Sequence, residues 1–240
     1  MGGVSVPSLR NLLPLAALLL AVLAACAPAA QEGPRVRVEQ FTGQVSFYPH
    51  EPGASWRFLP DGATLDEPPL TLISQGPTLL SGEPVTGWRL VGRGLDEVSY
   101  RRYGSDGVHL VRTVRPGAVI DFDPPVQEFP SQAALRVGAS WEGTTTASVT
   151  FPEAREENRR STLQVRYRYD IVDRRPTRVP AGEFDIYVIN FESETTDDEG
   201  TVVERISQTG WFEPYVGWVR HPIDHYLVGT NFAIPSDRNE

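Results

Sequence analysis

Apolar and polar residues alternate with a period of two along much of this chain, a pattern typical of β-strands. In the clearest case, alternate positions between residues 163 and 171 are aliphatic or aromatic: Leu163, Val165, Tyr167, Tyr169 and Ile171. The positions between them are polar or charged. Because successive strand residues point to opposite faces, this segment is predicted to be a half-buried antiparallel strand.

The following segments extend the same pattern. Residues 184–191 are apolar on both faces, so this strand is predicted to lie centrally and to be covered on both sides. Asp198-Glu199-Gly200 marks a turn, after which residues 201–209 are predicted to pair back as a hairpin. Further strands are expected at residues 45–48, 55–59, 70–73, 88–91, 98–103, 108–114, 147–151, 218–220 and 226–232.

These short strands and their regular turn signals predict an all-β fold. The architectures that fit are a sandwich or a curled antiparallel sheet forming a full or half barrel. The charged segment 152–160 is expected to be a single helical turn or a mobile loop.

One tetrapeptide occurs twice: residues 53–56 and 138–141 both read Gly-Ala-Ser-Trp. A turn follows each copy, at residues 103–107 and at 197–200. A duplicated β-unit would explain the repeat, with halves at residues 41–125 and 126–235 meeting near Asp123-Pro124-Pro125. A chance match is the alternative, and both stay open.

The start of the chain carries an apolar stretch that is too short to cross a bilayer. It ends in Leu23-Ala24-Ala25-Cys26, which resembles the lipobox of bacterial lipoproteins. The resemblance implies a signal peptide over residues 1–25, lipidation of Cys26, a flexible spacer to residue 40 and a β-domain over 41–235. Ordinary secretion and an uncleaved anchor are the alternatives.

Composition limits the partners. The formal net charge is −9, with arginine as the only basic residue besides four histidines, which excludes a strong phosphate-binding surface and makes nucleic acid an unsuitable partner. Cys26 is the only cysteine, so no intramolecular disulfide can form. Because the acidic chain has little attraction for anionic lipid head groups, the lipid on Cys26 must hold the protein to the membrane. Ala27 and Pro28 follow the cysteine in place of an inner-membrane retention aspartate, which favours the outer membrane or an outer leaflet.

Four further segments carry a second resemblance: residues 122–125 (FDPP), 137–141 (VGASW), 179–184 (VPAGEF) and 211–220 (WFEPYVGWVR). Their order is similar to that in uncharacterised exported bacterial β-proteins, grouped as domains of unknown function. Those proteins resemble the lipoprotein-carrier half barrels (LolA/LolB-like) in shape. The likeness implies a half-barrel topology and an envelope location, and it supplies no catalytic residue.

Candidates for chemistry are few. His221 and His225, taken as one strand, would share a face about 13 Å apart, too far for one metal ion. Asp121 and Asp123 would lie roughly 7 Å apart on one face, a separation known for paired catalytic carboxylates, but the prolines that follow favour an exposed strand end. We therefore predict no catalytic residue, no metal site and no cofactor.

The aromatic residues are the better candidates. Five of them are predicted to line an apolar ligand-binding face: Trp141, Tyr167, Tyr169, Trp211 and Trp218. The favoured function is a non-enzymatic, lipid-anchored envelope protein that binds a lipid, another hydrophobic ligand or an envelope partner. The alternative is a structural or assembly lipoprotein with a filled core and no ligand, and a surface hydrolase is less favoured.

The lipobox generates the first testable prediction. We expect the Cys26→Ser protein to carry no lipid and to leave the membrane fraction, because stable anchoring needs two or more acyl chains on this residue. Cell fractionation and the mass of the N-terminal peptide measure both effects. A Cys26→Ser protein that stays membrane-bound would contradict the lipobox interpretation.

Overall fold

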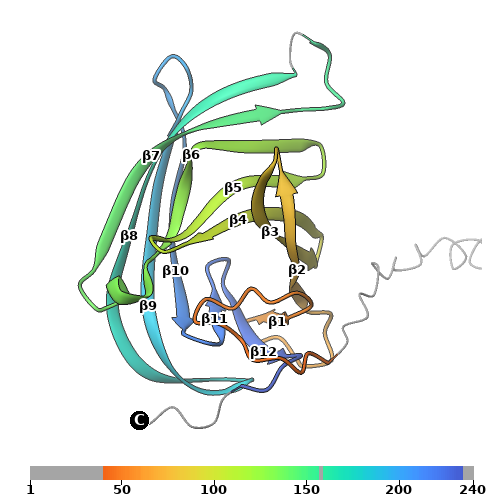
Figure 1. Cartoon of the computed structure of the whole chain (residues 1–240), viewed down its shortest axis with the longest axis vertical. Helices are drawn as coiled ribbons and strands as arrows, with labels where there is room; N and C mark the ends of the chain where they lie inside the picture. Colours follow the sequence, from red (N-terminus) through yellow and green to blue (C-terminus); the bar gives the residue numbers. More distant parts are fainter. Residues whose placement is uncertain (1–39, 157–158, 235–240) are drawn as a thin grey trace, which may run out of the picture. The chain divides into compact units, whose positions relative to one another are not determined.

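The structure is a computed structural model that describes residues 40–156 and 159–234. The predicted signal peptide, Cys26 and nearly all of the spacer lie outside these residues. The described chain forms an antiparallel barrel of twelve strands (Figure 1). Their bounds are β1 Ser55–Pro60, β2 Leu70–Leu80, β3 Glu83–Gly92, β4 Leu95–Gly104, β5 Gly107–Arg115, β6 Ala118–Pro130, β7 Ser140–Thr150, β8 Arg160–Val179, β9 Gly182–Thr196, β10 Val202–Glu213, β11 Gly217–His221 and β12 His225–Thr230.

Each strand pairs with the next along the chain, and β12 returns to pair with β1. The closing register runs from Trp56 opposite Thr230 to Pro60 opposite His225. The all-β, antiparallel prediction is confirmed, whereas the sandwich and half-barrel expectations are wrong. Closure satisfies the backbone groups that a half barrel would leave unpaired at its two edges.

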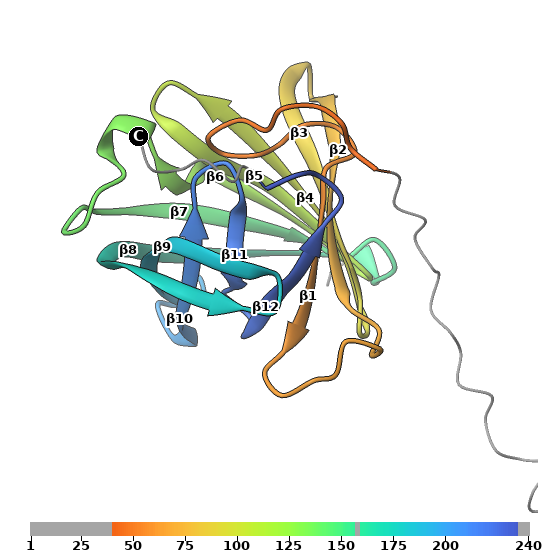
Figure 2. The same ribbon diagram turned by 90° about the horizontal axis from the view of Figure 1, so that it is seen from below.

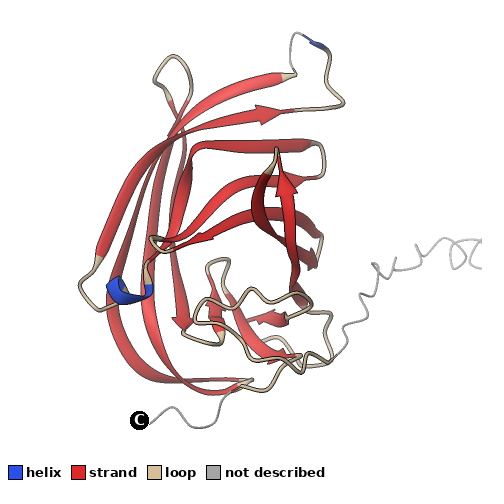
Figure 3. Cartoon of the chain, viewed as in Figure 1, coloured by secondary structure: helices blue, strands red, loops and turns tan. Residues whose placement is uncertain are grey.

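In the part of the chain that the structure describes, helical structure is confined to short turns such as Gln132–Ala134 (Figure 3). Within the described residues, no helix combines the length and apolar character needed to cross a membrane.

The alternation in β8 separates the inside of the barrel from the outside. Tyr167 and Ile171 are buried, while Arg168 between them is exposed and bonds the carboxylate of Asp170. The predicted half-buried strand is thus confirmed. Ion pairs between neighbouring strands cover the outer surface, and they include Arg89–Asp96, Arg112–Asp121, Arg174–Asp185 and Arg205–Glu194.

Part of strand β9, around residues 186–189, buries apolar side chains on both of its faces. Phe184, Ile186 and Val188 pack in one buried cluster, and Ile189 packs in a second. The paired ends of β8 and β9 curve beneath the barrel (Figure 1), where the Ala181 N–H donates to the carbonyl of Leu227 at 3.1 Å. The prediction of a strand covered on both sides is confirmed.

Residues 40–54, here called the closing loop, lie across one end of the barrel (Figure 2). The Tyr48 hydroxyl donates to the carbonyl of Pro130 at 2.7 Å, and its ring packs against Phe129 and Phe212. The strand expected at residues 45–48 is therefore wrong. The apolar residues Phe47 and Tyr48 fill the end of the barrel, and they do not reflect strand pairing.

Strand β6 was not expected, because Asp123-Pro124-Pro125 lies within it. Its pairing with β7 ends at Asp123, and its pairing with β5 shifts register beyond Asp121, so the prolines occupy an irregular stretch. Beyond Asp123, where β6 no longer pairs with β7, the β6 backbone forms hydrogen bonds with side chains. At Gln127, the N–H donates to the Tyr167 hydroxyl at 3.1 Å, and the carbonyl accepts from the Trp141 indole at 2.9 Å.

The two Gly-Ala-Ser-Trp copies occupy equivalent places, each leading into the first of six consecutive strands. The Gly53 N–H donates to the carbonyl of Ser74, and the Gly138 N–H donates to that of Ile171, both at 2.8 Å. A register shift follows Ser74 in β2 and Ile171 in β8. The two turns noted in the sequence differ in position, since residues 105–106 join β4 to β5 and residues 197–201 join β9 to β10. Duplication stays a prediction.

The split between β6 and β7 generates a prediction. Tyr167→Phe removes the acceptor of the Gln127 N–H and should lower the free energy of unfolding by about 1–3 kcal/mol, the cost of an unsatisfied buried donor. Denaturant unfolding measures this loss, and hydrogen exchange should accelerate at the Gln127 amide. Tyr100→Phe is the matched control, because the Tyr100 hydroxyl bonds no other described residue. Equal stability of the two variants would contradict this role for Tyr167.

Candidate ligand-binding cavity

The barrel encloses a cavity of about 460 Å³. Tyr48 and Pro49 of the closing loop line it at one end, while the exposed residues Arg115 and Glu204 line it toward the other. Strands β11, β12 and β1 have only five or six residues each, against twenty in β8, so the wall is low on their side. The cavity therefore has a closed end and an open end.

Most of the lining is apolar. Aliphatic side chains come mainly from strands β5 to β10: Leu110, Ile120, Val126, Val149, Leu163, Val165, Ile189 and Ile206. Aromatic rings join them from several strands: Trp56, Trp88, Phe122, Phe129, Tyr167, Tyr169, Phe191, Phe212 and Trp218. Such a surface excludes water and favours an apolar ligand by the hydrophobic effect.

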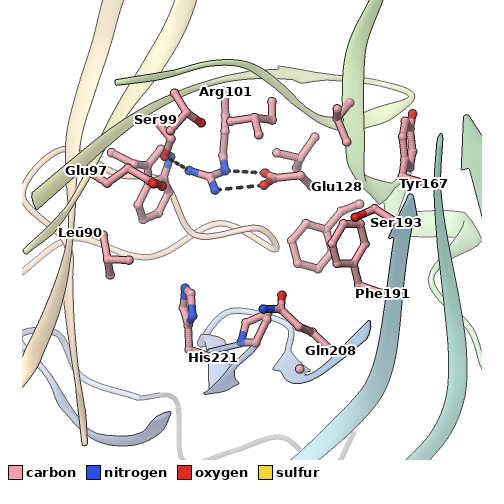
Figure 4. A pocket seen from close by; sticks show the side chains of 18 of the residues that line it. Leu90, Glu97, Ser99, Arg101, Glu128, Tyr167, Phe191, Ser193, Gln208 and His221 are labelled. Atoms are coloured by element: carbon pink, nitrogen blue, oxygen red, sulfur yellow. Dashed lines mark hydrogen bonds and ion pairs between the residues drawn. The ribbon is translucent and has the colours of Figure 1, made fainter. Parts of the chain in front are cut away.

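An ion pair lies within this apolar wall. The Nε and Nη2 atoms of Arg101 donate to the two carboxylate oxygens of Glu128 at 2.5 and 3.1 Å, and Nη1 donates to the Ser99 hydroxyl at 2.5 Å (Figure 4). Burial opposes the charge on Arg101, but the charge and hydrogen bonds of Glu128 outweigh it and raise the pKa of Arg101. The guanidinium thus stays ionised and bridges β4 to β6 across the intervening β5.

His221 and Gln208 lie across the cavity from this ion pair (Figure 4). The imidazole packs edge-on against Phe58 and Trp218, with ring centroids 5.6 and 6.4 Å away. Burial, followed by the positive charge of Arg101 and the neighbouring His225, lowers the pKa of His221 to about 3. His221 is therefore a neutral imidazole at physiological pH.

The phenols of Tyr103 and Tyr169 in the cavity also stay neutral. Burial raises the pKa of Tyr103 and that of Tyr169 above the usual range for tyrosine. A second ion pair in the lining joins Arg115 to Glu97 at 3.5 Å. The remaining ionised group is Glu204, which has no ion-pair partner among the described residues.

The structure separates the five aromatic residues predicted to bind a ligand. Tyr167, Tyr169 and Trp218 line the cavity. Trp141 lies behind Tyr169, with parallel rings 5.1 Å apart, and does not line it. Trp211 belongs to a separate group with Arg220 and Tyr226, whose guanidinium and ring lie within 5.6 Å of it.

Sequence reasoning missed the polar part of the cavity. The alternation of Glu97, Ser99 and Arg101 puts all three on the inner face, but charged residues on both faces of β4 hide that periodicity. Glu128 lies in the unexpected strand β6. The signal that could have found the pair is a lone arginine at an inward position of one strand with a lone glutamate at an inward position of another.

The two pairs of titratable residues considered as candidates for chemistry form neither a metal site nor a pair facing the cavity. His221 and His225 are opposite each other across the β11–β12 hairpin, so the separation derived for a single strand is wrong. Asp121 bonds Arg112 on the outer face, and Asp123 is exposed beside it, away from the cavity. Among the described residues, no three His, Cys, Asp or Glu side chains gather closely enough to hold a metal ion.

Two glycines allow indole rings to lie close to the backbone. Gly217 lies beside the indole of Trp56, whose Nε1 donates to the carbonyl of Val216 at 2.5 Å. Gly210 is the residue that Trp218 covers, and a Cβ there would overlap the indole ring. This contact holds Trp218 flat against β10 in the cavity wall.

No protein-family model matches the chain, and no curated protein matches its sequence. Two solved structures align over 78% of this chain and 99% of their own. One, from Parabacteroides distasonis, is provisionally described as a lipoprotein, with 14% identity and a TM-score of 0.38. The other, from Bacteroides fragilis, is provisionally described as an exported protein with a YmcC-like fold, with 13% identity and a TM-score of 0.34.

The environment of His221 generates a prediction. Its pKa lies below the value of about 6.5 in an unfolded chain, so its contribution to stability is complete above that pH and declines as the pH falls toward 3. We expect the His221 ring resonances to stay constant between about pH 5 and 8 in an NMR titration. The stability of His221→Gln relative to the wild type should rise on acidification. A midpoint near pH 6.5 for His221 would contradict this environment.

Proposed function

We propose that this protein is a lipid-anchored, non-enzymatic protein of the cell envelope that binds a hydrophobic small molecule inside its barrel. The observation that carries the proposal is the cavity of about 460 Å³ with its apolar lining. Ligand pockets generally have volumes of about 300–1,000 Å³ and are mostly apolar with a few polar groups.

The barrel size explains why such a space exists. Side chains can fill the interior of a barrel of about eight strands, whereas wider barrels enclose space for a ligand or a channel. Here twelve strands form the wall, and two apolar clusters fill only part of the interior. A purely structural protein would be expected to fill the remainder with side chains, so the cavity favours a ligand over that alternative.

The ion pair also argues against a hydrolase. Both carboxylate oxygens of Glu128 accept hydrogen bonds from Arg101, so this carboxylate is held as an ion-pair partner and is not poised as a general acid or base. Across the cavity, His221 is held as a weakly basic, buried imidazole. These groups are better suited to recognition than to proton transfer.

The envelope location rests on the lipobox resemblance at Cys26, which lies outside the described residues. An acidic domain has little electrostatic attraction to an anionic bilayer, so a lipid on Cys26 would supply the attachment. The direction toward an outer membrane or outer leaflet rests on Ala27 and Pro28.

Native mass spectrometry tests the proposed function. All twelve strands lie within residues 55–230, so protein without residues 1–26 retains the barrel. Purified from its own host without detergent, this protein should carry a copurified apolar molecule. Consistently unliganded protein that also fails to bind an apolar fluorescent dye would overturn the proposal.

Paired substitutions in β10 locate the ligand. Ile206 faces the cavity and Ser207 faces the outside, so Ile206→Trp should fill the cavity while Ser207→Trp should not. We expect Ile206→Trp to weaken dye binding at least about tenfold, equivalent to about 1.4 kcal/mol, with Ser207→Trp unchanged. Circular dichroism verifies that both variants fold. Equal binding by the two variants would place the dye outside the barrel.

A further inference from the structure

We propose that the ligand is a neutral amphiphile, with an apolar chain and an uncharged head group that bears hydroxyl or amide functions. This inference rests on the proposed function and names the class of molecule that the cavity selects. The shape of the cavity leaves the class open, and the arrangement of its charges decides it.

The guanidinium of Arg101 is already matched. Arg101 makes three hydrogen bonds, two to Glu128 and one to Ser99. A fatty-acid carboxylate entering the cavity would have to share this guanidinium with Glu128. Two carboxylates around one cation in a poorly solvated space repel each other, so the anionic head group loses more hydration than it regains.

The rest of the lining does not compensate. Arg115 already pairs with Glu97, and Glu204 adds an unmatched negative charge near the open end. The ionised groups of the cavity are thus three carboxylates and two guanidinium groups. An anion therefore approaches a cavity whose balance of charge is already negative.

A cationic head group is disfavoured where His221 lines the cavity, because Glu128 and Glu97 are already paired and only Glu204, near the open end, is left without an ion-pair partner among the described residues. Arg101 is the nearby positive charge, and its field acts against a second cation facing it across the cavity. Burial is the main cause of the lowered pKa of His221, and the positive charge of Arg101 across the cavity adds to it. A long-chain amine would meet the same field and would also lose its hydration.

Uncharged polar groups remain to recognise the head group. The side-chain amide of Gln208 bonds no other described residue, and it points into the cavity beside His221 (Figure 4). Ser193 brings a hydroxyl to the same space from β9. An amide, an imidazole and a hydroxyl together donate and accept hydrogen bonds without charge, which suits a polyol or amide head group.

Three amphiphiles with the same chain test the inference on protein lacking residues 1–26: 1-monododecanoylglycerol, dodecanoic acid and dodecylamine. Their dissociation constants are measured by displacement of an apolar fluorescent dye, below the critical micelle concentration. We expect the monoglyceride to bind at least about tenfold more tightly than either charged compound. Equal or tighter binding of the acid or the amine would overturn the inference.

Substitution of Glu128 tests the cause of the selectivity. Glu128→Gln leaves Arg101 without its anion, so the preference should shift toward dodecanoate by about tenfold or more. Glu192→Gln is the matched control, because it removes the same charge from the outer face of β9. A shift of equal size in both variants, or in neither, would contradict the assigned role of the Arg101–Glu128 pair.

A second variant keeps the test decisive if Glu128→Gln does not fold. Gln208→Leu should weaken the monoglyceride several-fold while dye binding is retained. Failure of the dye and of all three amphiphiles to bind would overturn the proposed function itself. Dye binding without selectivity for the monoglyceride would overturn only the inference about the head group.

Discussion

The pairing of β1 with β12 is the constraint on which the rest of this structure depends. Residues 56–60 of β1 pair with β12 on one side and residues 55–58 pair with β2 on the other, and this contact joins the two ends of a twelve-strand sheet. Once the sheet closes, every strand has one inner and one outer face. The outer face becomes a layer of arginine–carboxylate pairs. The inner face encloses more space than its side chains fill, and the cavity follows.

The closed end and the polar site divide this interior between folding and recognition. Aromatic rings from the closing loop and from β6 and β10 pack tightly at one end, where Tyr48, Phe129 and Phe212 meet. The cavity lies beyond these rings, and Arg101 and Glu128 lie in its wall. A buried ion pair of this kind adds little net stability because each charge loses hydration. Its position facing the cavity fits the role in ligand selection that we propose for it.

Local patterns in the sequence predicted what local geometry determines. The alternation through residues 163–171 specified a strand and its inner face, since successive residues of a strand point to opposite faces. The same reasoning failed where apolar residues serve another purpose: Phe47 and Tyr48 close the barrel, and Trp141 completes the hydrogen bonding of Gln127. Closure could not be predicted, because no local pattern links Trp56 to Thr230. Glu128 was not predicted as a cavity residue, because Pro124 and Pro125 argued against a strand at this position.

The closing loop has a kinetic consequence. With Tyr48 and Pro49 at one end of the cavity, a bound molecule arrives and departs by the same route. A newcomer cannot displace the occupant from behind, as it could in an open tube. Exchange then proceeds at the rate at which the first molecule leaves, and raising the concentration of a competitor does not hasten it. The proposed ligand would therefore stay bound for a time set by the cavity alone.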